Sequence, residues 1–474
     1  MLFLQLAEKL GVFAFSQSAR SVGGAPNFFM SCHPFLPPSL ISCYGISCKT
    51  QFLKHFGNGK LVHSLPRMNT ALKHWKEAAT VIISAGTRHK LSDGFSRCLD
   101  KGTSTPTTGT EGLSNFPHES TFDYDVLLLK RSGKSGFMPN AYVFPGGLIE
   151  PSDFSSEWLD IFKAFRRSPN FGLGIVKQQP ATRPPIFATD RTKLGSPIPG
   201  DVAFRICAVR ETFEESGVLL AVPKEEENSL LKKNENTSSQ NQTELTRVYQ
   251  MCDKSELAKW RVLVNKNPYN FIRMCRELEC LPNIWALHEW GNWLTPSGVY
   301  EKQRRYDTAF FMCCLQETPD TLQDEKEIVH FKWSPPSEIL HSFLGRQLWI
   351  APPQFYDLSR MCRFPSLAHL HNFASRRGSE GCEQWLPVRL VTDNVYISLL
   401  PGDSLYPEDG SGQIDVNKTT DASLQETEQG SSALHRIVCH DLHTAAVHIS
   451  ITPKYNHLLP FGNSFLRRDT NSQL

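Results

Sequence analysis

The feature that most restricts how this chain can fold is a short acidic stretch, residues 210–218, which reads Arg-Glu-Thr-Phe-Glu-Glu-Ser-Gly-Val. On a helix, Glu211, Glu214 and Glu215 stand at positions i, i+3 and i+4 and project from one face. Three adjacent carboxylates repel one another unless a cation neutralises them, and oxygen ligands suit a hard ion such as Mg²⁺. A solvated acidic helix face is the alternative for such a run of charge. This stretch alone does not distinguish between the two.

A second stretch lies upstream, where residues 143–153 read Val-Phe-Pro-Gly-Gly-Leu-Ile-Glu-Pro-Ser-Asp. An apolar run at 125–131 predicts a strand leading toward it, and the pair Gly146 and Gly147 lets the backbone approach a ligand closely. Together the two stretches resemble the box of the Nudix hydrolases, G-x5-E-x7-R-E-U-x-E-E-x-G-U, where U is apolar. Gly147 fills the first position, and residues 210–218 fill the second half.

Three departures separate this chain from the usual box. Asp153 stands in place of its first glutamate, and Thr212 stands where a larger apolar residue is usual. The pattern has seven residues between Asp153 and Arg210, but this chain has 210 − 153 − 1 = 56, so 56 − 7 = 49 residues are inserted. The entropy of closing a loop grows only logarithmically with its length, so the fold can tolerate this insertion.

Short sequence segments on both sides of the box resemble one branch of the family, the coenzyme A diphosphatases, from about residue 68 to the end of the chain. These segments lie at residues 78–82, 136–144, 293–296, 305–311 and 400–403. The resemblance implies an α/β fold: the Nudix α/β/α sandwich, with a helical insertion and a C-terminal accessory region.

That branch carries a further signature before the box, L-L-T-x-R-S-x3-R-x3-G-x3-F-P-G-G. Residues 127–132 read Leu-Leu-Leu-Lys-Arg-Ser and reach Phe-Pro-Gly-Gly at 144–147 in the same register. Leu129 replaces the threonine, Gly136 the second arginine and Asn140 the glycine, so half of the polar content is lost. The alternative interpretation of this apolar run is a buried strand whose charged end reaches solvent.

The basic pair that ends this run points to a phosphorylated substrate. Coenzyme A carries a 3′-phosphate besides its diphosphate, and a guanidinium can bind such a group through two hydrogen bonds. We therefore predict Lys130, Arg131 and Gly147 as substrate-binding residues, and the sequence does not say which basic residue contacts the phosphate.

The resemblance implies a metal site on the acidic helix. Hydrolysis of a diphosphate needs neutralised phosphate oxygens and a water molecule aimed at phosphorus, and divalent ions supply both. Glu211, Glu214 and Glu215 are the implied ligands of Mg²⁺ or Mn²⁺, with the backbone carbonyl of Gly146 completing the set. One box glutamate can instead act as general base, and the sequence does not choose among them.

Three more side chains belong to the predicted site. Arg210 joins the three glutamates as a catalytic residue that orients a carboxylate through an ion pair, and Asp153 is expected to accept a hydrogen bond from it. Glu327 precedes a predicted strand, where many Nudix proteins place an extra metal ligand or base; ordinary surface charge is the alternative.

The function implied is hydrolysis of the diphosphate of coenzyme A and acyl-coenzyme A, giving 3′,5′-ADP and (acyl-)phosphopantetheine. One alternative is another nucleoside diphosphate, such as ADP-ribose or, as a secondary substrate, capped RNA. The other is a catalytically silent nucleotide-binding module. The retained arginine and glutamates argue against a catalytically silent module, whereas Asp153 and the insertion leave that alternative open.

Composition shifts divide the chain. Residues 1–67 hold one acidic residue and little periodicity, which indicates a disordered extension, with a mitochondrial presequence as the alternative. The predicted organisation of the rest is a Nudix domain at 68–345, with an insertion at about 154–202, a mobile loop at 222–246 and a helical cap at 247–281, and an accessory region at 346–474 with a flexible segment at 403–431.

Apolar periodicity predicts the main elements. The expected strands lie at 78–85, 125–131, 306–315, 328–333, 386–400 and 436–451, and the expected helices at 204–216 and within 352–377.

The remaining features concern partners and compartment. The net charge of +2 gives no field that would attract DNA, and no apolar run is long enough to span a bilayer. Thirteen cysteines without a Cys-x2-Cys pair predict free thiols in a reducing compartment. The last residues, Ser472, Gln473 and Leu474, resemble a peroxisomal address that an import receptor reads, with a mitochondrial or cytosolic location as the alternatives.

Overall fold

The computed structural model describes most of the chain after residue 74, and residues 71–474 form one compact unit. The described residues are 75–87, 116–235, 244–249, 253–296, 305–391, 395–407, 417–419 and 431–461. The predicted extension at 1–67 and the C-terminal tripeptide lie outside these residues. Within them, no helix is long and apolar enough to cross a membrane.

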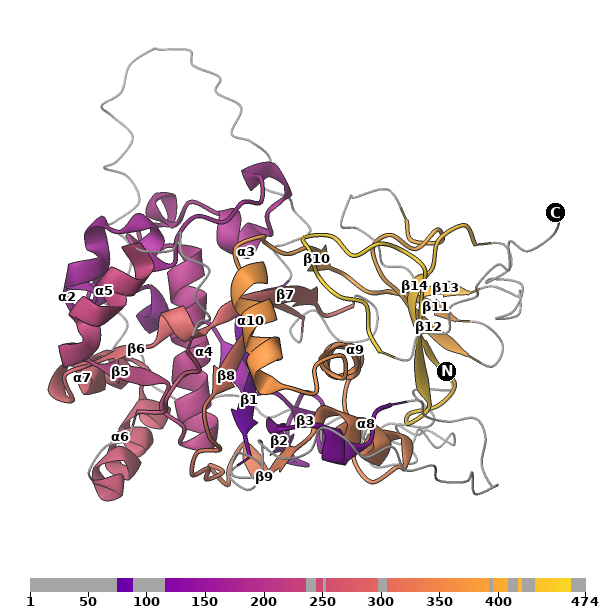
Figure 1. The fold of residues 1–474 in the computed structure, drawn as a ribbon, viewed down its shortest axis with the longest axis horizontal. Helices are drawn as coiled ribbons and strands as arrows, with labels where there is room; N and C mark the ends of the chain where they lie inside the picture. Colours follow the sequence, from indigo (N-terminus) through magenta and orange to yellow (C-terminus); the bar gives the residue numbers. More distant parts are fainter. Residues whose placement is uncertain are drawn as a thin grey trace, which may run out of the picture. The chain divides into compact units, whose positions relative to one another are not determined.

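A mixed sheet lies at the centre of this unit (Figure 1). Its strand order is β10-β7-β8-β1-β2-β3, with β4 paired to β1 and β9 paired to β2. The strands are β1 (Lys76–Gly86), β2 (Tyr124–Arg131), β3 (Tyr142–Val143), β4 (Gly146–Leu148), β7 (His288–Leu294), β8 (Tyr306–Leu315), β9 (Ile328–Ser334) and β10 (Gln384–Trp385). Strands β1, β2, β8 and β9 confirm the predictions made for those segments.

Strand β1 lies in the middle of the sheet, and both of its faces are apolar, so each face can pack against a core. It runs parallel to β8 and antiparallel to β2 and β4. Val81 and Ile83 point into one core cluster, whereas Ile82 points into the other, as the period of two requires. A strand covered on both sides reads as a nearly continuous apolar run, which is how residues 78–83 appear in the sequence.

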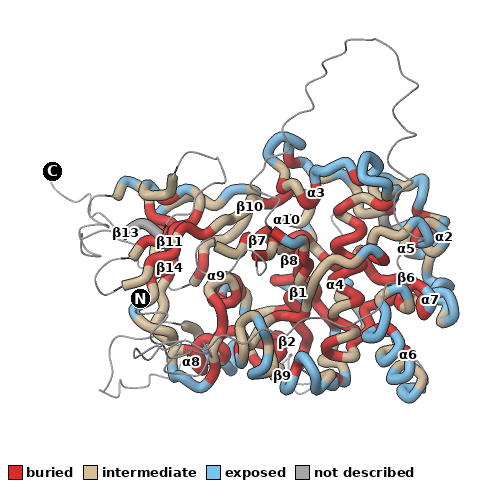
Figure 2. Tube along the Cα trace, turned by 180° about the vertical axis from the view of Figure 1, so that it is seen from behind, coloured by how far each residue is buried: buried red, intermediate tan, exposed pale blue. Residues whose placement is uncertain are grey.

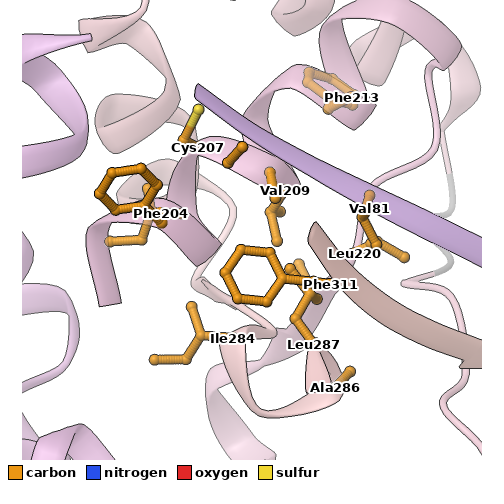
Figure 3. Close-up of a cluster of buried hydrophobic side chains, with 14 of the residues drawn as sticks. Val81, Phe204, Cys207, Val209, Phe213, Leu220, Ile284, Ala286, Leu287 and Phe311 are labelled. Carbon is orange, nitrogen blue, oxygen red and sulfur yellow. The ribbon is translucent and has the colours of Figure 1, made fainter. Parts of the chain in front are cut away.

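Helix α4 (Gly200–Ser216) covers one face of the sheet. Phe204, Val209 and Phe213 lie in a cluster with Val81 of β1 and Phe311 of β8 (Figure 3). The helix begins four residues before the predicted start, at residue 200 instead of 204, because its first turn is also buried. It ends at a glycine whose φ of 73° lies in the left-handed region that side chains rarely adopt.

Three helices cover the opposite face, namely α8 (Pro336–Leu344), α9 (Pro352–Met361) and α10 (Leu367–Arg377). Their apolar residues join Trp290 and Phe310 of the sheet in the second core cluster. Figure 2 shows the buried residues concentrated in the sheet and in α4. The sheet thus lies between two helical layers, and the predicted α/β class and sandwich are confirmed.

The insertion before α4 is built from short turns. These are η3 (Pro151–Phe154), α2 (Trp158–Ile161), η4 (Lys163–Arg167), η5 (Pro169–Gly172), η6 (Pro180–Thr182), α3 (Pro185–Ala188) and η7 (Arg191–Leu194). Trp158 and Phe165 are buried in the core cluster beneath α4. Arg183 forms ion pairs of 2.6 Å with Asp201 and 2.8 Å with the fully buried Glu289. The insertion is therefore part of the core.

The segment 222–246 corrects the prediction of a mobile loop. It forms the end of β5 (Ala221–Pro223), then η8 (Lys224–Glu226) and α5 (Glu227–Glu235), and only residues 236–243 lie outside the described part. Leu230 and Leu231 pack against the core, which the polar composition around them concealed. The predicted helical cap consists of α6 (Lys254–Lys266) and α7 (Tyr269–Glu277), followed by β6 (Cys280–Pro282), which pairs with β5.

The accessory region forms a second sheet, in the order β13-β11-β12-β14-β15. Its strands are β11 (Val388–Val391), β12 (Tyr396–Leu399), β13 (Asn417–Thr419), β14 (His435–Cys439) and β15 (Ala445–Ile449). Each long strand predicted here, at 386–400 and 436–451, is in fact an antiparallel pair. Polar residues between the apolar runs make turns, as where the amide of His440 donates to the carbonyl of Thr444 at 2.9 Å.

The predicted flexible segment 403–431 is also partly wrong. Strand β13 pairs in parallel with β11, and Asp403 is buried. Its carboxylate accepts two hydrogen bonds of 2.7 Å from the buried Arg436, and this ion pair fixes the start of the segment. Residues 408–416 and 420–430 lie outside the described part.

A buried carboxyl of the central sheet gives the first testable prediction. Asp307 accepts from Asn292 Nδ2 at 2.7 Å and from Gln384 Nε2 at 3.0 Å. Burial, the largest cause, raises the pKa of Asp307 to about 7 from 3.8. The folded protein therefore favours the protonated carboxyl, and this stabilisation is complete below the unfolded pKa and is lost as the pH rises through the folded one. The upper bound on the loss is about 4 kcal/mol.

We expect Asp307→Asn to gain stability relative to the wild type as the pH rises from about 5 to about 8, because its uncharged amide does not titrate. The measurement is the free energy of unfolding in urea at both pH values. Asp160→Asn, an exposed position of α2, is the matched control and should track the wild type. Identical slopes for Asp307→Asn and the wild type would contradict the assignment.

Candidate active site

Arg210 lies at the centre of the site that the box residues form. Its side chain is 1% exposed and reaches three carboxylates. Nε and Nη2 donate to the two oxygens of Asp153 at 2.9 Å, and Nη1 donates to Glu211 Oε1 and Glu214 Oε1, both at 2.9 Å. Nη2 also donates to the carbonyl of Leu148 at 2.9 Å. One guanidinium therefore joins α4, β4 and the turn before the insertion, and Asp153 accepts from Arg210 as the sequence predicts.

The departure at Asp153 is accommodated by a local turn. Asp153 is 1% exposed and closes a capping box on η3, in which its Oδ2 accepts from the amide of Glu150 at 2.9 Å. The same carboxylate thus fixes the turn and faces Arg210. An aspartate in place of the usual glutamate still delivers both oxygens to the guanidinium.

The adjacent Gly146 and Gly147, at the start of the box, serve different glutamates. The amide of Gly146 donates to Glu215 Oε2 at 3.0 Å. A Cβ on Gly147 would lie 2.4 Å from the Cδ atom of Glu211, so that only glycine leaves room for this carboxylate. The structure thus shows Gly146 acting through its amide, and metal binding by its carbonyl stays a prediction.

Burial makes the carboxyl groups of α4 costly to ionise. Burial is the largest cause that raises the pKa of Glu211 to about 7, where the charge of Glu214 adds to it and Arg210 opposes it. Burial likewise raises the pKa of Glu214. The pKa of Glu215 is raised well above its usual range by burial first and then by the charge of Glu211. The Arg210 guanidinium therefore does not offset the cost of ionising all three carboxyls in this buried position.

The donor chemistry of this cluster fits a divalent cation. No three His, Cys, Asp or Glu side chains in the described part of the chain are already arranged around one point. Glu211 and Glu214 each use one oxygen for Arg210, which leaves the second oxygen for a metal ion. A divalent ion accepts such oxygen ligands, and its charge would lower the raised pKa values of these carboxyl groups. The roles of Glu211, Glu214 and Glu215 as metal ligands stay predictions.

A surface hollow of about 510 Å³ begins at the end of β2. Its lining residues are Arg131, Ser132, Lys134, Ser135, Gly136, Phe137, Tyr306, Lys326 and Glu327. Arg131 Nη2 forms an ion pair with Glu327 Oε1 at 2.7 Å, and its Nε donates to the carbonyl of Phe137 at 3.1 Å. Glu327 is 55% exposed and is the ion-pair partner of Arg131, and its role as an additional ligand or base stays a prediction.

Lys130 lies away from this site. Alternation along β2 places Leu127 and Leu129 in the core cluster under α4, and Leu128 in the cluster on the other face. Arg131 therefore points to the side of α4, whereas Lys130 points to the opposite side, where its Nζ lies 5.8 Å from the ring centroid of Tyr142. Of the two basic residues predicted to bind substrate, the structure brings only Arg131 beside the box.

A further cation beside α4 is absent from the sequence prediction. Arg261 of α6 donates from Nε to the carbonyl of Glu214 at 2.9 Å, at the negatively polarised end of α4. Its charge also interacts with those of Glu215 and Asp324. No motif marks an arginine in the middle of an amphipathic helix, and only the packing of α6 against α4 identifies it.

Comparisons with known proteins agree with this geometry. The family model described as NUDT19 Nudix domain matches residues 75–361, and the one described as NUDT19 C-terminal domain matches residues 389–450. The chain belongs to the NUDT19 Nudix family. The first match ends with α9 on the central sheet, and the second covers most of the accessory sheet.

Three members of the NUDT19 family are similar over most of their length, and each is named acyl-coenzyme A diphosphatase NUDT19. The Xenopus laevis protein is 46% identical over 83% of this chain and 97% of its own. The Gallus gallus protein is 43% identical over 86% of this chain and 100% of its own, and the Homo sapiens protein is 39% identical over 83% and 96%.

The close approach at Gly147 gives a prediction for metal binding in this NUDT19 family member. We expect Gly147→Ala to displace the Glu211 carboxylate and to weaken Mn²⁺ binding by about tenfold or more, since misplacing a metal-site side chain typically costs this much. Isothermal titration calorimetry measures the affinity. Gly291→Ala is the matched control, because the nearest neighbour of its Cβ lies 4.0 Å away. Equal affinities for the two variants would contradict the role of Gly147.

Proposed function

We propose that this protein hydrolyses the diphosphate of coenzyme A and acyl-coenzyme A, using Mg²⁺, and releases 3′,5′-ADP and (acyl-)phosphopantetheine. The observation that carries the proposal is the cluster of Glu211, Glu214 and Glu215 on α4, held by Arg210 and Gly146. The substrate class comes from the names of the similar proteins in frog, chicken and human.

The chain's own residues prepare this reaction by fixing the carboxylates. Arg210 holds Glu211 and Glu214 through one nitrogen, and the amide of Gly146 holds Glu215 on the other side of the cluster. When bound, a divalent ion neutralises phosphate oxygens and lowers the pKa of a water ligand. Water adds to one phosphorus and the bridging oxygen leaves with the other, so that each product keeps one of the two phosphates of the diphosphate, and the nucleotide product also keeps its 3′-phosphate.

The choice of Mg²⁺ over Mn²⁺ is part of the proposal. Every predicted ligand offers oxygen, which suits the harder ion, although Mn²⁺ accepts the same donors. Removal of metal by a chelator should abolish turnover. Restoration by Mg²⁺ at millimolar concentration supports the proposal, whereas restoration by Mn²⁺ alone would overturn the assignment of Mg²⁺.

The decisive experiment is hydrolysis of coenzyme A, acyl-coenzyme A and ADP-ribose with Mg²⁺, with the products separated by chromatography. We expect 3′,5′-ADP from the coenzyme A species, and a loss of about 10²-fold or more in Glu215→Gln, because a charged contact to the reacting centre is removed. Glu277→Gln, on the exposed face of α7, is the matched control and should keep full activity.

The other outcomes separate the remaining functions. Turnover of ADP-ribose alone would retain the diphosphate chemistry and reject coenzyme A as the substrate. Capped RNA is tested as a fourth substrate, and its turnover alone would likewise reject coenzyme A. If none of the four substrates reacts, the chain is a nucleotide-binding module without catalysis.

We also propose that the protein is imported into peroxisomes by a receptor that binds its C-terminus. The support is the tripeptide Ser472, Gln473 and Leu474, in which glutamine replaces the usual basic residue. A fluorescent protein fused to the N-terminus should give puncta that coincide with a peroxisomal marker. One alanine added after Leu474 should disperse them into the cytosol, and unchanged puncta would refute the address.

A further inference from the structure

The hollow at the end of β2 combines cations with aromatic rings. Arg131, Lys134 and Lys326 lie along it, and Phe137 packs edge-on against Tyr306, with ring centroids 4.8 Å apart and planes at 70°. These residues come from the end of β2 and the loop after it, the start of β8 and the loop before β9. Its volume of about 510 Å³ lies within the range that small-molecule sites occupy.

The residues that line this hollow carry a net positive charge, because three cations accompany a single carboxylate and that carboxylate is paired with one of them. Glu327 forms its ion pair with Arg131, and Arg131 also donates to Ser135 Oγ at 2.9 Å and 3.2 Å. The guanidinium thereby holds the loop that carries Lys134 and Phe137. The exposed ammonium groups of Lys134 and Lys326 add two positive charges that this ion pair does not cancel.

The hollow adjoins the acidic cluster of α4. Strand β2, which ends at Arg131, pairs with β1 where Val126 is opposite Ser84, and β4 pairs with the preceding part of β1. Ala79 is the partner of Gly147 in β4, next to the glycine whose amide binds Glu215. Arg131 and Glu327 lie near enough to Glu215 for their charges to interact with its carboxyl group. A ligand with its diphosphate at the cluster can therefore extend into the hollow.

The two ends of the proposed substrate differ in what they need. The pantetheine arm is uncharged and carries amides, whereas the nucleotide end carries a flat adenine ring and a 3′-phosphate dianion. Lysine ammonium groups bind phosphate, and aromatic side chains stack on bases. The hollow matches the nucleotide end on both counts.

We propose that this hollow binds the 3′-phosphorylated adenosine end of the substrate, with Lys134 and Lys326 on the 3′-phosphate and Phe137 and Tyr306 against adenine. The inference rests on the proposed hydrolysis of coenzyme A and extends it, because it names the residues that distinguish a 3′-phosphorylated nucleotide from its 3′-hydroxyl counterpart. Arg131 acts as a positioning residue for the loop.

The first test compares coenzyme A with dephospho-coenzyme A, which lacks only the 3′-phosphate. In the double variant Lys134→Gln/Lys326→Gln, kcat/KM for coenzyme A should fall about tenfold, because two charged contacts are lost. The value for dephospho-coenzyme A should stay within about twofold of the wild type, since neither contact serves it. An equal fall on both substrates, or no fall on coenzyme A, would overturn the assignment.

The matched control for charge is Lys177→Gln/Lys193→Gln, which removes two lysines of the insertion whose side chains are 68% and 81% exposed. It should leave the ratio of the two kcat/KM values unchanged. A ratio that falls as far in this control would show that net charge, and not the hollow, sets the preference.

The aromatic residues should give the opposite pattern, because both substrates carry adenine. Phe137→Leu keeps an apolar side chain but removes the ring, and it should lower kcat/KM about tenfold on both substrates with their ratio preserved. Tyr269→Leu on α7, 47% exposed, is the control. Unchanged kcat/KM on both substrates in Phe137→Leu would reject stacking in the hollow.

Binding without turnover separates this inference from the proposed function. If the wild type hydrolyses neither substrate, the proposed hydrolysis fails, and calorimetry with 3′,5′-ADP and 5′-AMP then tests the hollow alone. Tighter binding of 3′,5′-ADP that disappears in Lys134→Gln/Lys326→Gln supports the subsite. Equal binding of the two nucleotides by the wild type would overturn it.

Discussion

The site depends on one buried interaction, the contact of the Arg210 guanidinium with the carboxylates of Asp153, Glu211 and Glu214. A buried ion pair is costly unless its hydrogen bonds are satisfied, and here Nε, Nη1 and Nη2 all donate. Because these partners lie on different elements, the same guanidinium that orients the acidic helix also fixes the turn at Asp153 beside it. Removing this cation would leave several buried carboxylates without a counter-charge.

The insertion explains how that contact survives the distance along the chain. Asp153 and Arg210 are 57 positions apart in the sequence, yet their side chains are 2.9 Å apart. The intervening residues pack as part of the core, with Trp158 under α4 and Arg183 bridging to Glu289 in β7. An ordered insertion of this kind holds the two halves of the box in register, which a flexible loop of equal length would not do.

An element could be predicted from the sequence where its own residues determine it, and not where contacts with residues far along the chain do. Strands β1 and β8 are apolar on both faces, so their own residues are enough to predict them. By contrast, segment 222–246 looks like a loop because its polar residues outnumber Leu230 and Leu231, and only the core they contact makes it a helix. The same holds for 403–431, where the partner of the buried Asp403 is Arg436, beyond the end of the segment.

The sequence by itself determined the helix that carries the three glutamates, because residue type and spacing specify a helix face and its charge. Its resemblance to the Nudix box implied the family and the contact between Arg210 and Asp153. Only the tertiary structure decided that Gly146 serves Glu215 through its amide, that Lys130 lies on the opposite face from Arg131, and that Arg261 reaches the end of α4. It also decided that Phe137, Tyr306 and Lys326 line one hollow. Spacing along a chain fixes directions within one element, whereas the meeting of side chains from separate elements follows from strand order, register and packing.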